Sequence, residues 1–323
     1  MKFGNVLVIG GSGFIGRHLL NLLAARGISA IVPTRRRERA KHLILLPTVD
    51  VVETDVNAPG VIEGLARQSD AVINLAGVLH SRSSKTSHEE SDRYGPEFFA
   101  THVELPRRIV AACRAAGVKR LLHMSALGAA PNAPSAYQRS KYAGEQTVLA
   151  ANDLAVTVFR PSVVFGPEDR FLNLFAKLSG MSPVLAIACP ESRFQPVYVR
   201  DVAQAFAHSL NERDAIGRSY DLAGPHEVTL RDLVKYVCRL KGHRRLIFGL
   251  SDRLGWLQAS VLEHLPGKLL TRDNLLSMRV PNVCAAPFPF GIVPTALEAA
   301  VPSYMAHAAP PERLGMLRHK AHR

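Results

Sequence analysis

The pair Tyr137 and Lys141, in the stretch YQRSK, could carry acid–base chemistry. Residues four apart share a face of a helix, so the Lys141 ammonium would lie near the Tyr137 phenol. A neighbouring positive charge favours the phenolate and should lower the pKa of Tyr137 from its ordinary value of about 10. Ser125, twelve residues before Tyr137, could hold a substrate oxygen. These residue types predict proton exchange with a bound substrate, although the same spacing is also common by chance.

A glycine-rich turn near the start of the chain could hold a nucleotide. The turn fits two dinucleotide-binding patterns, Gly11-x-Gly13-x-x-Gly16 and Gly10-x-x-Gly13-x-x-Gly16. Glycines allow backbone N–H groups to approach a pyrophosphate, and the following helix presents the positive end of its dipole. The alternative is a tight turn without a ligand. A strand before the turn and a helix after it favour the nucleotide.

The residues after the second predicted strand bear on which nucleotide is bound. Proteins that bind NAD usually carry an acidic residue about 20 positions past the glycines. Here Arg35 and Arg36 occupy that place. A guanidinium can pair with a ribose 2′-phosphate, whereas a carboxylate would repel it. The sequence therefore favours NADP(H), with NAD(H) as the second choice. The alternative is that these arginines are only the solvated start of a helix.

Apolar runs typical of buried strands alternate with helical patterns through the first half of the chain. The runs span residues 6–9, 28–32, 49–53, 71–75 and 120–124. This alternation predicts an α/β fold with a doubly wound parallel sheet, the Rossmann arrangement. Asp55 and Val56 follow the third run, and the Asp55 carboxylate could accept the adenine amino group. Leu75, Ala76 and Gly77, at the end of the fourth run, should pass close to the cofactor.

The alternation loosens after residue 167, which predicts a second, smaller α/β region. We expect residues 1–167 to form the nucleotide-binding domain, with 195–212 returning to it. Residues 168–194 and 213–308 would form a cap, followed by a basic tail at 309–323. Asp201 is expected to cap a helix over 202–210. Thr229 and Asp232 should open another helix that ends at Gly242.

The motifs resemble those of the extended short-chain dehydrogenase/reductase superfamily, the NAD-dependent epimerase/dehydratase-like proteins. The glycines, Ser125, Tyr137 and Lys141, then RPSVVFGP (160–167) and VYVRDVA (197–203), follow the order of that family. The resemblance implies catalytic roles for Ser125, Tyr137 and Lys141. It implies cofactor contacts from Gly10, Ser12, Gly13, Phe14, Ile15, Gly16, Arg35, Arg36, Asp55, Val56, Leu75, Ala76, Gly77, Lys141, Pro161 and Val163. In the family, the cap selects the substrate.

Three stretches are similar to bacterial relatives of the NADPH-binding accessory subunit of respiratory complex I. They are HMSALGA, YQRSKYAGE and LLTRDNLLSMRVPNV. These are atypical members of the superfamily, and related proteins are tied to coenzyme Q synthesis. The resemblance therefore implies a respiratory-complex or quinone-synthesis protein as a partner.

The chain departs from the family pattern at two positions. Ile9 stands where the family has a Thr, and His102 stands where it has the Asn of the catalytic tetrad. Pro106 has no N–H, so within a helix it would leave the carbonyl of His102 free to hold a water for proton relay. The alternative, which we favour from the sequence, is that Pro106 begins a new helix.

The formal net charge of +13 favours anionic partners. Five basic residues lie between Arg35 and Lys41, and the tail from Arg313 to Arg323 has four more with no acid. The tail could contact an anionic membrane surface, or it could be a solvated end. Nucleic acid is an unfavoured partner because no aromatic residues are interleaved with the basic ones.

Cysteine usage and hydropathy indicate the setting of the protein. The four cysteines are far apart and form no CxxC pair, so we expect a reduced cytoplasmic protein without a metal site. Prolines interrupt the longest uncharged stretches, and no signal segment precedes the first strand. We therefore expect a cytoplasmic location, with peripheral contact at the inner face of the cell membrane through the tail.

Two functions remain open at this point. The first is an NADP-dependent reductase, dehydrogenase or epimerase that acts on an unknown small molecule through Tyr137 and Lys141. The second is a protein that binds the nucleotide for stability and serves as a structural or assembly partner. The catalytic residue set favours the first function, and His102 together with the complex I resemblance favours the second.

Overall fold

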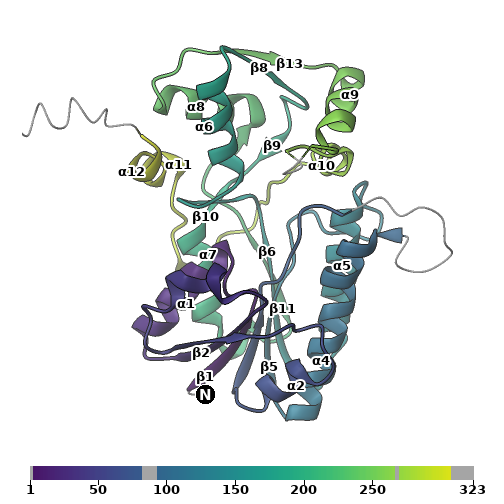
Figure 1. The fold of residues 1–323 in the computed structure, drawn as a ribbon, viewed down its shortest axis with the longest axis vertical. Helices are drawn as coiled ribbons and strands as arrows, with labels where there is room; N and C mark the ends of the chain where they lie inside the picture. Colours follow the sequence, from purple (N-terminus) through teal and green to yellow (C-terminus); the bar gives the residue numbers. More distant parts are fainter. Residues whose placement is uncertain (1–2, 82–92, 266–268, 307–323) are drawn as a thin grey trace, which may run out of the picture.

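The computed structural model describes residues 3–81, 93–265 and 269–306. The predicted basic tail at 309–323 therefore lies outside the described residues. A seven-stranded parallel sheet forms the centre of the molecule, in the order β11-β6-β5-β4-β1-β2-β3 (Figure 1). The strands are β1 (Asn5–Ile9), β2 (Ser29–Thr34), β3 (Val49–Glu53), β4 (Ala71–Asn74), β5 (Arg120–Met124), β6 (Ala155–Pro161) and β11 (Arg218–Leu222). The predicted α/β fold with a Rossmann-type sheet is confirmed.

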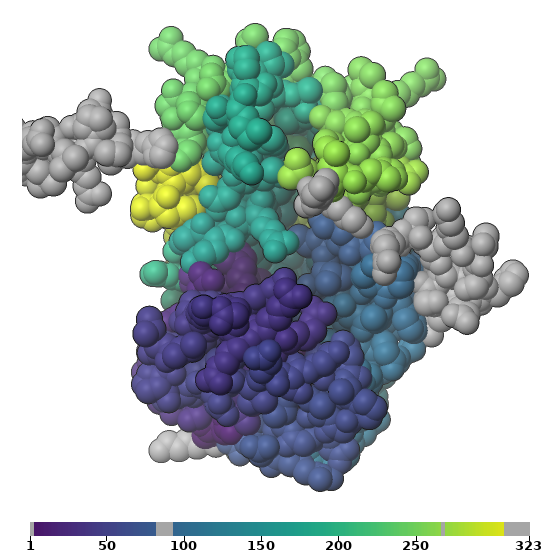
Figure 2. All heavy atoms as spheres, viewed as in Figure 1, coloured from purple at the N-terminus to yellow at the C-terminus, as the bar shows by residue number. Residues whose placement is uncertain are grey.

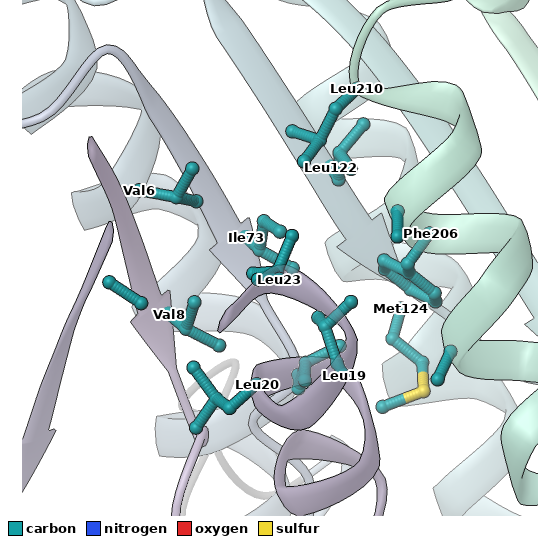
Figure 3. Packing of buried hydrophobic residues seen from close by; sticks show 14 of the residues in the cluster. Val6, Val8, Leu19, Leu20, Leu23, Ile73, Leu122, Met124, Phe206 and Leu210 are labelled. Carbon is teal, nitrogen blue, oxygen red and sulfur yellow. The ribbon is translucent and has the colours of Figure 1, made fainter. Parts of the chain in front are cut away.

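Helices cover both faces of the sheet, which explains the continuous apolar strands. Val6 and Val8 face α1 (Phe14–Ala25) and α7 (Val199–Ser209), as the close view of this cluster shows for Leu19, Leu23 and Phe206 (Figure 3). The alternate residues of the strands pack against the helices of the opposite face. Those helices are α2 (Val61–Ala66), α4 (Leu105–Ala116) and α5 (Ala136–Leu149). Strand order reverses between β1 and β4, where such sheets bind ligands.

A smaller α/β part packs beyond the carboxyl ends of the strands (Figure 1). Its helices α6 and α8 cover a parallel pair, β8 with β13. The two strands are β8 (Val184–Ile187) and β13 (Leu246–Gly249). The helices of this part are α6 (Phe171–Met181), α8 (Leu230–Leu240), α9 (Asp252–Leu262), α10 (Arg272–Ser277), α11 (Leu297–Ala300) and α12 (Pro302–Met305). The short strands are β7 (Val164–Phe165), β9 (Arg193–Phe194), β10 (Val197–Tyr198) and β12 (Val228–Thr229), and the 3₁₀ turns are Arg37–Leu43, Arg213–Ala215 and Pro289–Gly291.

Two details differ from the sequence expectations for this second part. The sequence places residues 218–222 in the cap, but β11 pairs with β6 and extends the central sheet. Asp201 does not cap its helix as expected, because it lies inside the first turn of α7, and its carboxylate accepts the N–H and hydroxyl of Thr295. The contact spans 94 residues of sequence, so local spacing could not reveal it. The predicted cap of α8 is confirmed, since Thr229 accepts the N–H of Asp232.

The helix that carries His102 is continuous. It runs from α3 (Pro96–Phe98) through a π-helical segment (η3, Phe99–Glu104) directly into α4. The expectation that Pro106 begins a new helix is wrong, because helical residues precede it without a break. The wider π turns accommodate a residue that cannot donate the next helical hydrogen bond.

The described residues also bear on metals, thiols and membranes. They contain no cluster of side chains suited to a metal ion, and all four cysteines are free thiols. None of the helices in these ranges has the length and apolarity needed to cross a bilayer.

Candidate functional site

The glycine turn between β1 and α1 is packed too tightly for side chains at two positions. Gly10 has a φ of +82°, and a Cβ there would lie 2.8 Å from the backbone nitrogen of Ala76. A Cβ on Gly16 would lie 2.3 Å from the carbonyl oxygen of Gly11. These approaches bring the turn against the end of β4 and fold it onto the first turn of α1. The first and last glycines of the pattern therefore shape the turn itself.

Gly13 has a different environment. It is the N-cap of the 12-residue helix α1, no side chain caps the helix, and the first turn has no acid. A Cβ on Gly13 would have one close neighbour, the carbonyl oxygen of Gly10 at 3.1 Å. Ser12, Phe14 and Ile15 surround this helix start. The backbone therefore offers an uncapped, positively polarised helix end, which suits a pyrophosphate.

The residues predicted to read the ribose and the adenine lie at the neighbouring strand ends. Arg35 and Arg36 are exposed directly after β2. β2 reaches the turn, since a Cβ on Gly11 would lie 3.0 Å from a methyl group of Val32. Asp55 accepts the N–H of Asn57 at 2.9 Å, which fixes the loop after β3 and leaves a carboxylate near the surface. The position of these side chains fits the predicted nucleotide.

Lys141 is buried at the carboxyl ends of the central strands, beside the last residue of β5. Its Nζ donates to the carbonyl oxygen of Met124 at 3.1 Å, and burial lowers the pKa of its ammonium to about 8. A Cβ on Gly77 would lie 3.3 Å from the same Nζ. Lys141 therefore joins the ends of β4 and β5.

Tyr137 lies one helical turn before Lys141 on α5, and its ring packs edge-on against Phe98 and His102. The expected lowering of its pKa is wrong for this structure. Burial raises the pKa of the Tyr137 phenol to about 12, because the phenolate loses its hydration. The group is therefore a protonated phenol across the neutral range.

Ser125 follows β5 and has an unpartnered hydroxyl. The residue is 2% exposed, and among the described residues its Oγ has no hydrogen-bond partner. A buried hydroxyl without a partner costs free energy, so it is expected to bond to a ligand or water. This observation fits the prediction that Ser125 holds a substrate oxygen.

His102 bridges two elements of the site. Its Nε2 accepts the N–H of Val78 at 3.1 Å, and its Nδ1 lies 2.9 Å from the hydroxyl of Ser140. Ser140 in turn donates to the carbonyl of Tyr137. This chain requires a neutral ring with its proton on Nδ1. Burial, then the charge of Lys141, holds the pKa of His102 well below its ordinary value.

The carbonyl of His102 faces α5. A Cβ on Gly144 would lie 1.9 Å from that oxygen, and Pro106 cannot donate to it. Glycine at position 144 therefore permits a close approach of η3 to the helix that carries Tyr137 and Lys141.

Three polar residues position the site although the sequence patterns did not assign them to it. Asn74 donates to Nδ1 of the buried His123 at 3.1 Å and accepts the N–H of Ala76, which orders the end of β4. Asp273 at the start of α10 accepts the first backbone N–H groups of α5, from Ala136 and Tyr137. Asn282 accepts the N–H of Val163 and the hydroxyl of Ser162, and it donates to the carbonyl of Leu127.

One stretch of the sequence could have indicated that Asp273 and Asn282 are important. Asp273 and Asn282 both lie in LLTRDNLLSMRVPNV, which the family resemblance singles out without giving it a role. Asn282 also fixes the backbone directly after β6, next to Pro161 at the end of that strand, and both Pro161 and Val163 are predicted to contact the cofactor. The predicted residues thus lie at or after the carboxyl ends of the parallel strands, on the same side of the sheet.

Comparisons with known proteins agree with this arrangement. The model of the NAD-dependent epimerase/dehydratase family matches residues 6–223. A mitochondrial protein of Rattus norvegicus, NADH dehydrogenase (ubiquinone) 1 alpha subcomplex subunit 9, is 31% identical over 315 residues, which cover 90% of this chain and 77% of the relative. The ceramide reductase of Caulobacter vibrioides is 34% identical over 201 residues, 62% of this chain and 59% of the relative.

Solved structures share the fold. MoeE5 in complex with UDP-glucose and NAD superimposes with a TM-score of 0.65, 24% identity, and coverage of 78% of this chain and 87% of that one. The UDP-glucuronic acid 4-epimerase of Bacillus cereus, in complex with UDP-glucuronic acid and NAD, gives a TM-score of 0.67 at 17% identity. It covers 93% of this chain and 98% of that one. At this level of identity, the likeness concerns the fold alone.

Proposed function

Because the chain belongs to the NAD-dependent epimerase/dehydratase family, we propose that it binds NADP(H) and catalyses a reductase, dehydrogenase or epimerase reaction on a small molecule. The bound nicotinamide would supply or accept a hydride. The observation that carries the proposal is the buried, unpartnered hydroxyl of Ser125. It directly follows Met124, whose carbonyl accepts from Lys141, and Lys141 lies one helical turn after Tyr137 on α5.

Each residue has a distinct part in this proposal. Ser125 Oγ donates to the substrate oxygen, and the protonated Tyr137 phenol gives or takes the proton at that oxygen. Lys141 remains close enough to the nucleotide edge to contact the ribose and to favour the phenolate when the proton leaves. His102 keeps its ring neutral and supports the start of this helix through Ser140.

The cofactor preference rests on two arginines. Arg35 and Arg36 would pair with the 2′-phosphate of NADP(H), and Asp55 would accept the adenine amino group. The backbone from Gly10 to Gly16 would hold the pyrophosphate, and the strand ends at Leu75–Gly77 and Pro161–Val163 would line the nicotinamide half. NAD(H) remains the competing cofactor.

A second candidate function is a nucleotide-bound structural or assembly protein of a respiratory or quinone-synthesis complex. It is favoured by the 31% identity to the complex I subunit over most of the chain and by His102 in the place of the family's Asn. In either function, we place the protein in the reduced cytoplasm at the inner face of the cell membrane, near such a partner.

One experiment separates the two functions. The purified protein is denatured to release and identify its nucleotide, and the refolded or nucleotide-exchanged protein is then incubated with NADPH and an extract of small molecules from the cell. Oxidation of NADPH that Tyr137→Phe abolishes supports the enzyme. A nucleotide that stays bound without turnover, together with full function of Tyr137→Phe in a deletion strain, would reject it.

A further inference from the structure

Large apolar side chains are exposed at one end of the cap. They belong to three elements, the strands β8 and β13 and the helix α9. Their exposed fractions include 63% for Leu246, 54% for Phe248 and 61% for Leu257. The distal surface is defined here by Val184, Leu246, Phe248, Leu254, Trp256, Leu257 and Val261. The elements that carry it, β8, β13 and α9, lie toward the end of the long axis that is opposite β1 and β2 (Figure 1).

The pairing of the two strands explains why one of their faces is apolar and exposed. Leu246 pairs with Val184, and Phe248 pairs with Ala186, so these side chains share the outer face. Leu185 and Ile187 point to the opposite face and are buried under α6 and α8. An outer sheet face made of such residues has no covering element among the described ranges, although apolar burial would stabilise it.

Helix α9 extends the same surface. Leu254, Leu257 and Val261 recur at helical spacing on its outward side, whereas Gly255 and Ala259 are buried. A Cβ on Gly255 would lie 3.0 Å from the Cβ of Ala188, and Gln258 donates to the carbonyl of Ala186. The helix is therefore fixed against the end of β8, and both elements form the end of the molecule in Figure 2.

Basic side chains surround a hollow beside the exposed strands. This hollow, of about 760 Å³, is lined by Pro183, Val184, Leu246 and Ile247 together with Lys235, Arg239, His243, Arg244, Arg245 and one acid, Asp232. Asp232 lies 3.5 Å from Lys235. Within the described ranges, neither Arg239 nor Arg244 has a carboxylate within ion-pairing distance. The charges next to the apolar surface are therefore mainly positive and available.

We propose that the distal surface docks on a bilayer that contains anionic phospholipid. The apolar side chains of β13 and α9 enter the interface, and Arg239 and Arg244 in the hollow bind the phosphate of a lipid headgroup. An anionic membrane offers a negative surface directly over an apolar layer, and this order matches the cationic hollow beside the apolar strands. The proposal requires neither the enzymatic function nor the tail.

Trp256 makes the docking directly measurable, because it is the only tryptophan of the chain and lies on α9. Vesicles of phosphatidylcholine with and without phosphatidylglycerol are added to the full-length protein. We expect a blue shift of the tryptophan emission and quenching by brominated acyl chains with the anionic vesicles. Both effects should weaken as salt is raised, because the attraction to the headgroups is screened.

Two matched pairs of variants test the apolar and the charged parts. Phe248→Glu with Leu257→Glu should reduce vesicle binding more than tenfold, whereas Leu45→Glu, at an 86% exposed site far from α9, should not change it. Arg239→Gln with Arg244→Gln should weaken binding about 25-fold, from about fivefold for each charge. Arg213→Gln with Arg218→Gln removes the same charge at the edge of the central sheet and should have little effect.

The outcomes distinguish docking by the distal surface from docking by the basic tail or by a protein partner. Unchanged nucleotide affinity shows that each variant is folded. A truncation after Ala306 should retain the Trp256 shift if the distal surface docks. The proposal is overturned if anionic vesicles leave Trp256 unshifted, if the glutamate variants bind as well as the parent, or if the truncation alone abolishes binding. Stable association with a purified protein but not with vesicles would assign the surface to a protein partner instead.

Discussion

The carboxylate of Asp273 holds the backbone of Tyr137. Its Oδ2 accepts the Tyr137 N–H at 3.1 Å, and its Oδ1 accepts the N–H of Ala136 at 2.7 Å. A carboxylate at the positive end of a helix stabilises that end through both the hydrogen bonds and the helix dipole. The proposed acid of the site is thus positioned by a residue of the cap.

We expect Asp273→Ala to lower turnover more than nucleotide affinity. The loss of the two bonds should cost about 1 kcal/mol of stability and loosen the first turn of α5. Steady-state kinetics and nucleotide titration measure the two effects. Thr229→Ala removes a comparable cap from α8 and should leave turnover unchanged. Equal loss of turnover in both variants would show a general effect of destabilisation.

Tyr137→Phe should retain nucleotide affinity and lose turnover by about 10²–10⁴-fold, the usual contribution of general acid–base catalysis. Only the hydroxyl is removed, so the ring contacts with Phe98 and His102 remain. An ultraviolet titration compares the variant with the parent. Because burial raises the pKa of Tyr137 to about 12, the difference spectrum should show no phenolate from this residue at neutral pH. A phenolate near neutral pH would contradict the burial argument.

The pH dependence of stability should reveal Lys141. Its pKa is about 8 in the folded protein against an ordinary value of 10.5, so between these limits the unfolded chain binds more protons. Stability should therefore rise as pH increases through this window, relative to Lys141→Met, by on the order of 3 kcal/mol. Denaturant unfolding of both proteins at each pH gives the difference in their free energy of unfolding. The titration of the other groups contributes equally to both proteins and cancels from this difference. Parallel profiles would refute the lowered pKa.

Two glycine variants should separate nucleotide binding from folding. Gly13→Val should abolish nucleotide binding and keep a cooperative unfolding transition, since Gly13 has an extended backbone with a φ of −80° and its Cβ would have one close neighbour, the Gly10 carbonyl oxygen at 3.1 Å. Gly16→Ala should lower stability by about 1–3 kcal/mol, because its Cβ would lie 2.3 Å from the Gly11 carbonyl. Calorimetry and nucleotide titration test both variants. Normal nucleotide affinity in Gly13→Val would show that the glycine turn does not bind the pyrophosphate.

Arg35→Ala with Arg36→Ala should weaken NADPH binding at least tenfold more than NADH binding. Charged hydrogen bonds contribute roughly 1.5–3 kcal/mol each, and NADH has no 2′-phosphate to form them. Titration with both nucleotides gives the ratio. Arg37→Ala with Arg39→Ala, in the adjoining turn, is the charge-matched control. An unchanged ratio of NADPH to NADH affinity would show that Arg35 and Arg36 are solvated side chains that do not contact the 2′-phosphate.

The parts of the fold that follow from local pattern were predictable. β5 begins and ends where the apolar run 120–124 does, because it is buried on both faces. The glycine turn was predictable because its glycine spacing, the apolar strand before it and the helix after it all lie within one short stretch of sequence. The raised pKa of Tyr137 was not, since the spacing to Lys141 says nothing about the hydration that the phenol loses.

The contacts that position the site could not be predicted from local sequence patterns, because they join residues far apart in the chain. Asn282 reaches Val163 across 119 residues, and a single polar residue has no periodicity to mark it. The exchange of Asn for His at position 102 was visible, but its double bridge to Val78 and Ser140 needed the fold.

The reach of Asp273 also sets an order in time. The contact with Ala136 spans 137 residues, which a ribosome adds in roughly 7–27 s at about 5–20 residues per second. During that interval the growing chain already has its glycine turn, its first five strands and Tyr137, but not the carboxylate that fixes the start of α5. Nascent or truncated chains that include β11 but end before residue 273 should therefore capture nucleotide before they can use it, because the carboxylate that fixes the start of α5 is added later.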